Sequence, residues 1–354
     1  MLKMRILINT PCRSLIGGGG VASHYSGLQH YWNEKVKYNT VGKRSRTNKF
    51  SAALWLPLDI LKFIFRILCF RPDFIVLNPS LSRNAIKRDM FYSKLAKLFN
   101  IKCVIMFHGF NVDNVKFQES KVAQWLNSYA TLVLVLSASF KEWLEKYSVV
   151  VPIEITSTKV EDKLLDNFDV LSRGGCVNSI LFLSRATKEK GLFIAIDVFK
   201  ILASKYPSLK FRVVGGGPDL DAAIGMARPF SDRISFTGEL KGEALINEFV
   251  NNDLYLFTSY HEGMPASVLE AMSFGLPVIS RPVGALIDFF KDDKMGYLVD
   301  SFNPHDFIDP ITALIDSPEK CRMISHYNYA YAKQNFYASM VAKQIEETLN
   351  KYSK

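Results

Sequence analysis

Two glutamates at the start of a predicted helix could bind hydroxyl groups. Glu262 and Glu270 are separated by seven residues within the segment 259–272, which follows a short apolar run. Pro265 suits the first position of a helix, so the free N–H groups and positive dipole end of that helix would form an anion site. Carboxylates beside an anion site suit a ligand that carries hydroxyl groups as well as phosphate, as a sugar and a ribose would. The alternative is that both glutamates are solvated residues at a helix end.

A second segment concentrates cations where another helix is predicted to begin. Arg185 and Lys190 lie in residues 183–191, between a predicted strand and a helix that starts at Gly191. Cations at a helix N-terminus oppose the dipole by about 0.3–1 kcal/mol. A bound diphosphate would reverse that sign, because arginine donates paired hydrogen bonds to phosphate oxygens and lysine adds a point charge. The alternative is a solvated run of charges.

Four consecutive glycines, Gly17, Gly18, Gly19 and Gly20, precede a predicted helix. Glycines permit positive φ and a close approach of the backbone to a ligand. The spacing is unlike a nicotinamide site, because seven residues separate the glycines from the strand and no acidic residue follows about 20 positions later. The segment is either a loop that touches phosphate or acceptor, or a plain linker.

A lone histidine and two aspartates are further candidates. His108 follows a buried strand and precedes a glycine, which favours a position at a ligand site over a purely structural one. Asp219 and Asp221 form a D-x-D pattern that could hold a divalent cation, but aspartate is also a favoured cap at a helix start. We predict helix capping here and no metal site.

The elements that must position these residues alternate between strand and helix along the whole chain. This pattern predicts an α/β protein whose parallel sheets carry helices on both faces. We expect two doubly wound, Rossmann-like domains that face a cleft, with ligands at the carboxyl ends of the strands. The glycine-rich segment 173–178 is the predicted linker. The expected domains are 1–172 and 173–336, with a helix at 337–354 that packs back on the first domain. The predicted strands are 5–9, 74–78, 103–107, 131–137, 179–184, 211–215, 234–237, 254–258 and 278–280.

The chain's 354 residues carry a formal net charge of +10, which favours an anionic binding partner. Residues 1–150 hold 22 Lys and Arg against 8 Asp and Glu, whereas residues 151–354 hold 22 against 26. No recognised nucleic-acid-binding module accompanies the basic residues. The five cysteines are scattered, which fits a reducing compartment, and no signal peptide is evident at the start.

Residues 52–70 form the most apolar window of the chain. Charged residues interrupt it, which argues against a membrane span. It fits a buried amphipathic helix or a helix that lies on a membrane face. Four cations precede it: Lys43, Arg44, Arg46 and Lys49. We therefore expect this part of the first domain to bind anionic lipid.

Taken together, these segments resemble the retaining glycosyltransferases of family 4, which have the two-domain GT-B fold. The resemblance is strongest over residues 180–299. It rests on the Glu262–Glu270 spacing, the Arg185 and Lys190 pair, the turn 214–218, and the segments 236–238 and 275–279. The first half matches more loosely, through the glycine loop and residues 107–109. Residues 151–155 depart from the asparagine-proline element that family members often carry at that place.

The resemblance implies a role for each candidate residue. Arg185 and Lys190 would neutralise the donor diphosphate, and Glu270 would accept hydrogen bonds from the ribose. Glu262 would hold the transferred sugar, and His108 would contact that sugar from the other domain. The remaining implied contacts are Gly216 and the backbone of Gly263, Met264 and Pro265 for the donor, and Gly17, Gly18, Gly19 and Gly20 for phosphate or acceptor.

The expectation is therefore a cytoplasmic, retaining and metal-independent glycosyltransferase of polysaccharide or cell-envelope biosynthesis. Its substrates would be a nucleotide-sugar donor and a glycan acceptor, with the acceptor carried on a lipid or a surface polysaccharide. No cofactor and no nucleic acid are expected. The enzyme would sit peripherally at the inner face of the cell membrane through its N-terminal domain. The alternative is a GT-B-fold sugar-nucleotide epimerase.

Overall fold

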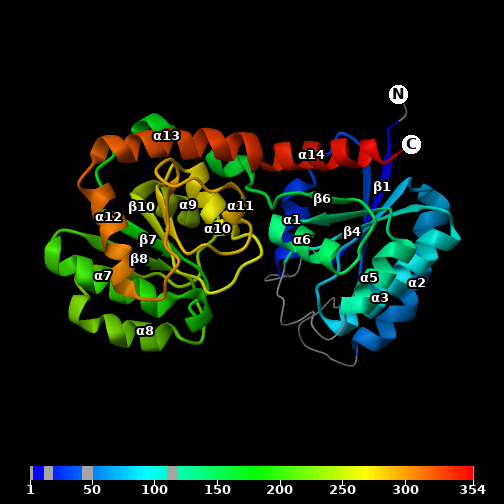
Figure 1. Ribbon diagram of the computed structural model, residues 1–354, viewed down its shortest axis with the longest axis horizontal. Helices are drawn as coiled ribbons and strands as arrows, with labels where there is room; N and C mark the ends of the chain where they lie inside the picture. The colour runs from blue at the N-terminus through cyan, green and yellow to red at the C-terminus, as the bar shows by residue number, and fades with distance from the viewer. Residues whose placement is uncertain (1–2, 12–18, 42–50, 110–118, 354) are drawn as a thin grey trace. The chain divides into compact units, whose positions relative to one another are not determined.

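The computed structural model describes residues 3–11, 19–41, 51–109 and 119–353. The chain divides into two compact units, and Figure 1 shows the elements of each. Unit 1 comprises Met1–Lys159 and Ala338–Lys354, and unit 2 comprises Val160–Tyr337. Within the described residues, each unit contains one six-stranded sheet whose neighbouring strands are all parallel. The predicted doubly wound α/β architecture is confirmed for both units.

The sheet of unit 1 has the strand order β2-β1-β3-β4-β5-β6. The four central strands were predicted, whereas the edge strands β2 and β6 were not. β2 is a partly exposed edge strand of sequence KVKYNT, and β6 has only three residues, so neither shows the apolar run of a buried strand. The strands are β1 Arg5–Thr10, β2 Lys35–Thr40, β3 Phe74–Leu77, β4 Lys102–Met106, β5 Leu132–Val135 and β6 Ile153–Ile155.

The helices of unit 1 cover its sheet. One core cluster joins alternate strand residues such as Ile75 and Ile105 to apolar residues of α2, α3, α5 and α6. The last helix, α14, contacts α1, and its buried Glu346 accepts hydrogen bonds from the backbone N–H groups of Asn33 and Glu34, each at 2.8 Å. The helices are α1 Gly19–Leu28, α2 Ser51–Phe70, α3 Arg83–Leu98, α5 Glu119–Tyr129, α6 Ala138–Lys146 and α14 Ala338–Lys351.

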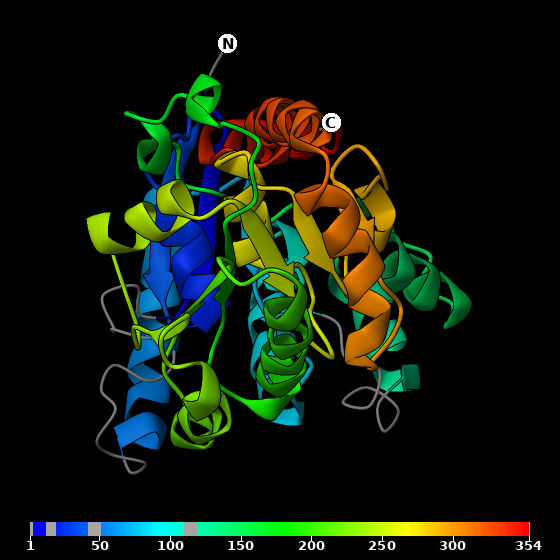
Figure 2. The same ribbon diagram turned by 90° about the vertical axis from the view of Figure 1, so that its left-hand side faces the viewer.

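Unit 2 repeats this plan with the strand order β12-β11-β10-β7-β8-β9, seen from a second side in Figure 2. Its strands are β7 Ser179–Leu183, β8 Lys210–Val214, β9 Ile234–Phe236, β10 Leu254–Phe257, β11 Val278–Ser280 and β12 Gly296–Leu298. Its helices are α7 Leu192–Lys205, α8 Leu220–Ala227, α9 Glu243–Asn251, α10 Ala266–Ser273, α11 Leu286–Phe289, α12 Ile308–Ile315 and α13 Pro318–Asn335. All but the three-residue edge strand β12 correspond to predicted strands.

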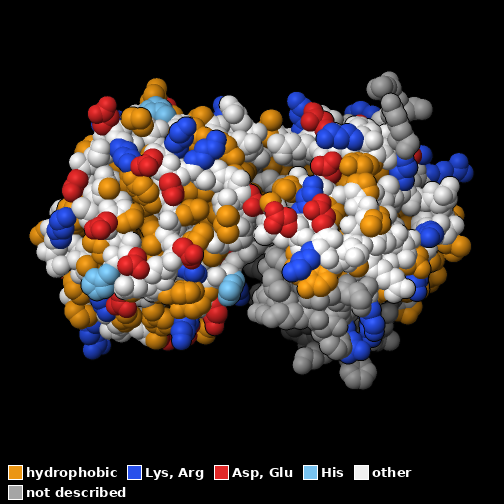
Figure 3. Space-filling model, in the orientation of Figure 1, with side chains coloured by type: hydrophobic (Ala, Val, Ile, Leu, Met, Phe, Trp, Pro, Cys, Tyr) orange, Lys and Arg blue, Asp and Glu red, His pale blue; other side chains and the backbone are white. Residues whose placement is uncertain are grey.

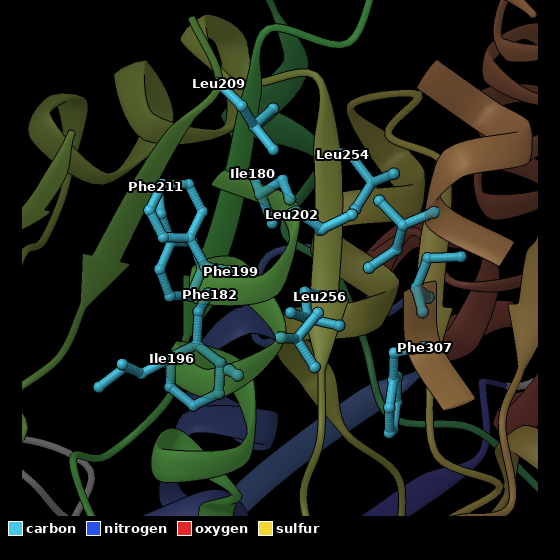
Figure 4. Packing of buried hydrophobic residues seen from close by; sticks show 14 of the residues in the cluster. Ile180, Phe182, Ile196, Phe199, Leu202, Leu209, Phe211, Leu254, Leu256 and Phe307 are labelled. Carbon is cyan, nitrogen blue, oxygen red and sulfur yellow. The ribbon is translucent and has the colours of Figure 1, made fainter. Parts of the chain in front are cut away.

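The core of unit 2 is built from aromatic and branched side chains on β7, β8, β10 and α7 (Figure 4). Phe199 of α7 stacks on Phe211 of β8 with ring centroids 5.3 Å apart. Phe182, Leu254 and Leu256 complete the buried centre. Because these strands are hydrogen-bonded neighbours packed on this core, their carboxyl ends are held in a fixed register, which is what a ligand site at that edge requires.

The chain passes between the units at residues 159–160 and 337–338, and not at the predicted linker 173–178. Arg173 explains the difference. Its guanidinium donates to the carbonyls of Phe249, Asn252 and Phe274, at the C-terminal ends of α9 and α10. Burial lowers the pKa of Arg173 to about 10. A glycine-rich segment that starts with a half-buried arginine bonded to these helix-end carbonyls is part of unit 2.

No described helix combines the length and the apolar character needed to cross a membrane. The apolar window 52–70 forms α2, whose buried side contributes Phe63 and Ile67 to the core of unit 1. Lys43, Arg44, Arg46 and Lys49 lie outside the described residues.

Candidate functional site

The strand order of unit 2 reverses between β7 and β10, which are hydrogen-bonded neighbours. Such a reversal opens a crevice at the carboxyl ends of the two strands, where open α/β sheets bind ligands. The segment that holds Arg185 and Lys190 follows β7, and the segment that holds Glu262 follows β10. Both predicted donor-binding segments therefore meet at one edge of one sheet.

Backbone contacts lock these two segments together. Gly191 has φ of +76°, and a Cβ there would lie 2.0 Å from the carbonyl oxygen of Thr258. The Thr258 hydroxyl donates to the Gly191 carbonyl at 2.8 Å, and the Tyr260 N–H donates to the Glu189 carbonyl at 2.9 Å. Only glycine permits both this conformation and this approach. Helix α7 begins one residue later than predicted, at Leu192, and Lys190 ends a short 3₁₀ turn before it.

Lys190 and Glu262 form an ion pair at the centre of this edge. The Lys190 Nζ lies 2.5 Å from Glu262 Oε1, and the Ser259 hydroxyl donates to the same oxygen at 2.9 Å. The two side chains keep 20% and 15% of their exposure, so both remain reachable from solvent. An anion that binds Lys190 would compete with Glu262 and free that carboxylate to accept other hydrogen bonds.

The loop before α10 presents its backbone at the same edge. Pro265 is the N-cap with extended backbone, so the helix begins at Ala266, one residue later than predicted. Glu270 lies half-buried in the second turn. Near this helix, burial raises the pKa of Tyr255, whose hydroxyl donates to the Leu183 carbonyl at 2.9 Å. Met264 lies half-buried in the loop.

Two further residues shape this loop, and neither was predicted. Gly284 has φ of +56°, and a Cβ there would lie 2.2 Å from the carbonyl oxygen of Gly263. The Arg281 guanidinium stacks 3.7 Å from the ring centroid of Phe302 and donates to the Ser259 carbonyl at 3.2 Å. Arg281 follows β11, so its place just after a strand was the one signal in the sequence. Through this hydrogen bond to Ser259, Arg281 holds the start of the loop in position.

The glycine turn after β8 supports the Arg185 segment. The Ala186 N–H donates to the Gly216 carbonyl at 3.0 Å, and a Cβ on Gly217 would lie 2.4 Å from the Ala186 carbonyl oxygen. Arg185 itself is exposed. Asp219 accepts a hydrogen bond from the Lys188 N–H at 2.7 Å, so this aspartate fixes the same loop. Among the residues that the structure describes, no group of three His, Cys, Asp or Glu side chains could hold a metal ion.

Unit 1 has its own strand reversal, between β1 and β3. Asn9 is the last residue but one of β1, Asn78 follows β3, and His108 lies just after β4. The Asn78 Oδ1 accepts from the Tyr25 hydroxyl at 2.8 Å and lies 2.8 Å from His108 Nε2. The Asn78 amide nitrogen donates to the Asn9 carbonyl at 2.8 Å. The predicted site residue His108 therefore belongs to a cluster of uncharged polar side chains.

His24 joins this cluster and was not predicted. Its ring lies 4.9 Å from that of His108 and is 1% exposed. Both ring nitrogens of His24 are buried without a hydrogen-bond partner. Burial, with His108 and Lys159 nearby, holds the pKa of His24 well below its usual range, and burial lowers the pKa of His108 to about 4. Both imidazoles are neutral at neutral pH.

The structure describes only the second half of the predicted glycine loop. Gly17 and Gly18 lie outside the described residues, whereas Gly19 and Gly20 form the first residues of α1. The expectation of a four-glycine loop is therefore wrong for the last two glycines. A Cβ on Gly20 would meet nothing within 4 Å, so no close backbone contact requires glycine at that position.

Comparison with known proteins supports the assignment of this fold. Residues 168–331 match the family model of glycosyl transferases group 1. An uncharacterized glycosyltransferase of Haemophilus influenzae is 26% identical over 246 residues, which are 65% of each chain. The sulfoquinovosyl transferase SQD2 of Arabidopsis thaliana is 32% identical over 139 residues, which are 38% of this chain and 25% of that protein. The chain thus spans two thirds or less of these curated relatives.

Solved structures extend the likeness to both units. A sucrose-phosphate synthase from Thermosynechococcus elongatus superposes with a TM-score of 0.76 at 16% identity, covering 99% of each chain. The Anabaena protein Alr3699/HepE, solved in complex with UDP, superposes with a TM-score of 0.74 at 18% identity, covering 98% of this chain and all of that one. At such identities these structures support the fold alone. The second unit thus matches glycosyl transferases group 1 over residues 168–331, and the chain has the two-unit α/β architecture of the GT-B fold.

Proposed function

We propose that this protein transfers a sugar from a nucleoside-diphosphate-sugar to a hydroxyl group of a glycan acceptor, with retention of the anomeric configuration. The observation that carries the proposal is the Lys190–Glu262 ion pair at the β7–β10 reversal, inside the region that matches the family model. A relative in fold, Anabaena Alr3699/HepE, was solved with UDP-glucose, which is a donor of this class.

The proposed binding step exchanges one anion for another at Lys190. The donor diphosphate takes the ammonium group, with Arg185 as a second cation, and Glu262 turns its oxygens to the hydroxyls of the transferred sugar. Glu270 accepts from the ribose hydroxyls. The backbone of Gly263 and Met264, held by Gly284, lines the sugar site. A carboxylate that is paired before the donor arrives costs less to bury than a free one.

The proposed chemical step breaks the bond between the anomeric carbon and the diphosphate through an oxocarbenium-like transition state. The acceptor oxygen bonds to the anomeric carbon from the same face, and its proton passes to the departing diphosphate. Negative charge develops on the leaving diphosphate, where Lys190, Arg185 and the N–H groups that open α10 stabilise it without a metal ion. His108 contacts the sugar as a neutral imidazole, which can exchange hydrogen bonds with a hydroxyl without carrying charge. The nucleotide-sugar is a substrate, and no cofactor is proposed.

A panel of nucleotide-sugars tests this proposal through thermal unfolding. A donor present at 100 times its dissociation constant should stabilise the folded state by about 2.7 kcal/mol. Incubation of the stabilising donor with and without acceptor then separates the reactions, because a transferase needs the acceptor and an epimerase converts the donor alone. The anomeric proton of the product reports retention or inversion. No stabilisation by any nucleotide-sugar would contradict the proposal.

We further propose that the acceptor is lipid-linked and that unit 1 docks on the cytoplasmic face of the membrane through α2. Its outer side exposes four apolar side chains at helical spacing, Leu58, Leu61, Phe65 and Leu68, each more than half exposed. An apolar stripe beside cations is the pattern of a helix that lies in a membrane interface. Basic and apolar side chains lie over α2 and α3 on the face shown in Figure 3.

Co-sedimentation with vesicles of phosphatidylglycerol and phosphatidylcholine tests this surface. We expect the double variant Leu61→Ser with Phe65→Ser to bind about tenfold more weakly for each side chain removed. Val150→Ser with Ile155→Ser is the matched control, because those two side chains are equally apolar, exposed and in the same unit. Equal losses in both pairs would contradict docking through α2.

A further inference from the structure

A groove between α3 and α5 of unit 1 is used by none of the roles proposed above. It has a volume of about 490 Å³. Its floor is apolar, formed by Ile86 and Met90 of α3 and Trp125 of α5. Trp125 is 1% exposed, and its indole N–H already donates to the Ser93 hydroxyl at 2.9 Å. Ile86 is 2% exposed, so the half-buried Met90 is the apolar side chain of the floor that a ligand can reach. The indole offers no free donor.

The rim of this groove is cationic. Lys87 and Lys94 lie seven residues apart on α3, and thus on one side of that helix, while Lys121 faces them from α5. All three are exposed, and none pairs with a carboxylate of the described residues. Arg83 adds a fourth cation to the lining. Like charges gathered around one cavity repel each other, and a bound anion removes that cost.

The acidic residue of α3 that the structure describes does not neutralise the groove. Asp89 is fully buried and pairs with Arg88, at 2.6 Å. At the far end, Lys97 donates to the Ser128 carbonyl at 3.0 Å and lies over the Tyr129 ring. No acidic side chain stands among the described residues that line the cavity. The groove is therefore positive along its length.

We infer that this groove is a binding site for a phosphate ester that carries an apolar part, separate from the nucleotide-sugar site of unit 2. The cations of the rim take the phosphate, and Met90 on the floor takes the apolar part. A simple inorganic anion would leave the floor uncovered. Helix α3, which lines the groove, also packs on α2, since Tyr92 of α3 lies edge-on against Phe63 of α2 with ring centroids 4.8 Å apart. A phospholipid headgroup and a soluble phosphate ester share the required chemistry.

Calorimetric titration of the full chain with three probes tests the inference. The probes are dihexanoylphosphatidylglycerol below its micelle concentration, glycerol 1-phosphate and inorganic phosphate. We expect the lipid to bind most tightly and Lys94→Ala with Lys121→Ala to weaken it about 30-fold. The control pair Lys146→Ala with Lys351→Ala removes two exposed cations of the same unit outside the groove and should leave affinity unchanged. Met90→Glu, which puts a carboxylate on the floor, should abolish binding.

Each outcome decides the matter. Tighter binding of the lipid than of glycerol 1-phosphate supports a ligand with an apolar part and identifies a lipid as its source. Equal binding of the two overturns the inference, because the floor would then hold no apolar group. The inference is overturned if no probe binds, if inorganic phosphate binds as well as both esters, or if the control pair loses as much affinity as the groove pair. Thermal stabilisation by the nucleotide-sugar should be unchanged in the groove pair, so failure here is distinguishable from failure of the proposed transferase.

Discussion

The two strand reversals of this protein carry opposite chemistry. In unit 2 the reversal between β7 and β10 holds a cation and a carboxylate, Lys190 and Glu262, at an edge open to solvent. In unit 1 the reversal between β1 and β3 is lined by neutral groups, including Asn78, His108 and the buried His24. The same topology thus provides a site suited to a diphosphate in one unit and a site suited to hydroxyl groups in the other.

The net charge of each half of the sequence does not match the charge of the groups at its strand reversal. Residues 1–150 carry a net charge of +14 and residues 151–354 a net charge of −4. Yet the described reversal of unit 1 holds neutral histidines, whereas Arg83, Lys87, Lys94 and Lys121 line the groove of α3 and α5. Bulk charge therefore does not locate an anion site within a unit. The positions of a few individual cations do, at the carboxyl ends of strands in unit 2 and on the helices α3 and α5 in unit 1.

Among the changes that test this comparison, removal of Lys190 should have the largest effect, and it should act on the rate of transfer. Lys190→Ala takes away the cation that the leaving diphosphate needs, so we expect kcat/KM for transfer to fall about 10²–10³-fold. Lys200→Ala is the control, since that lysine also pairs with an acid, Asp197 at 3.2 Å, but on the surface of α7. Steady-state kinetics measure both. A loss below tenfold for Lys190→Ala would place the anion site elsewhere.

Gly191→Ala should come next, because it disturbs the framework of the unit 2 site. The added Cβ would meet the Thr258 carbonyl at 2.0 Å with φ of +76°, which we expect to lower the free energy of unfolding by about 1–3 kcal/mol. Donor binding should weaken as the two loops separate. Gly225→Ala, in α8 with nothing within 4 Å of the new Cβ, should be neutral or stabilising. Denaturant unfolding distinguishes them, and equal stability of both variants would contradict the proposed lock.

Acid should weaken unit 1 through its neutral histidines. The unfolded chain binds a proton at each histidine near pH 6.5, whereas in the folded chain His108 does so near pH 4 and His24 well below its usual range. The free energy of unfolding is therefore unaffected above pH 6.5. It should fall below that by about 1.4 kcal/mol per pH unit for each histidine. Chemical denaturation across pH should show a shallower slope in His24→Phe, and His30→Gln, which removes an exposed imidazole of unit 1, is the control.

A carboxylate placed beside His108 should give the smallest effect and the most local one. Asn78→Asp puts a negative charge where Oδ1 now lies 2.8 Å from His108 Nε2, so the pKa of that imidazole should rise by about one unit or more. NMR titration of the histidine ring protons measures the shift. Asn84→Asp, on the exposed side of α3, should leave the titration unchanged. An unmoved His108 in Asn78→Asp would mean that the two side chains do not face each other in solution.

Much of the fold could be predicted because buried parallel strands read as apolar runs. β1, β3, β4, β5 and the strands β7 to β11 of unit 2 were all predicted in this way. Three of the four edge strands, β2, β6 and β12, were missed, because an edge strand needs no continuous apolar run. The unit boundary was misplaced because a glycine-rich segment looks like a linker, whereas the anchoring of Arg173 to three helix-end carbonyls depends on residues 76 to 101 positions away.

The sequence by itself determined which residues could meet a donor: Arg185, Lys190, Glu262 and Glu270 stand just after strands or at helix starts, and local rules predict that. The tertiary structure alone decided that Lys190 pairs with Glu262, that Arg281 and Gly284 shape the loop, and that His24 lies against His108. It also gathered the cations of α3 and α5 around one groove. Such contacts depend on which strands become neighbours, and strand order is set by the packing of the whole sheet.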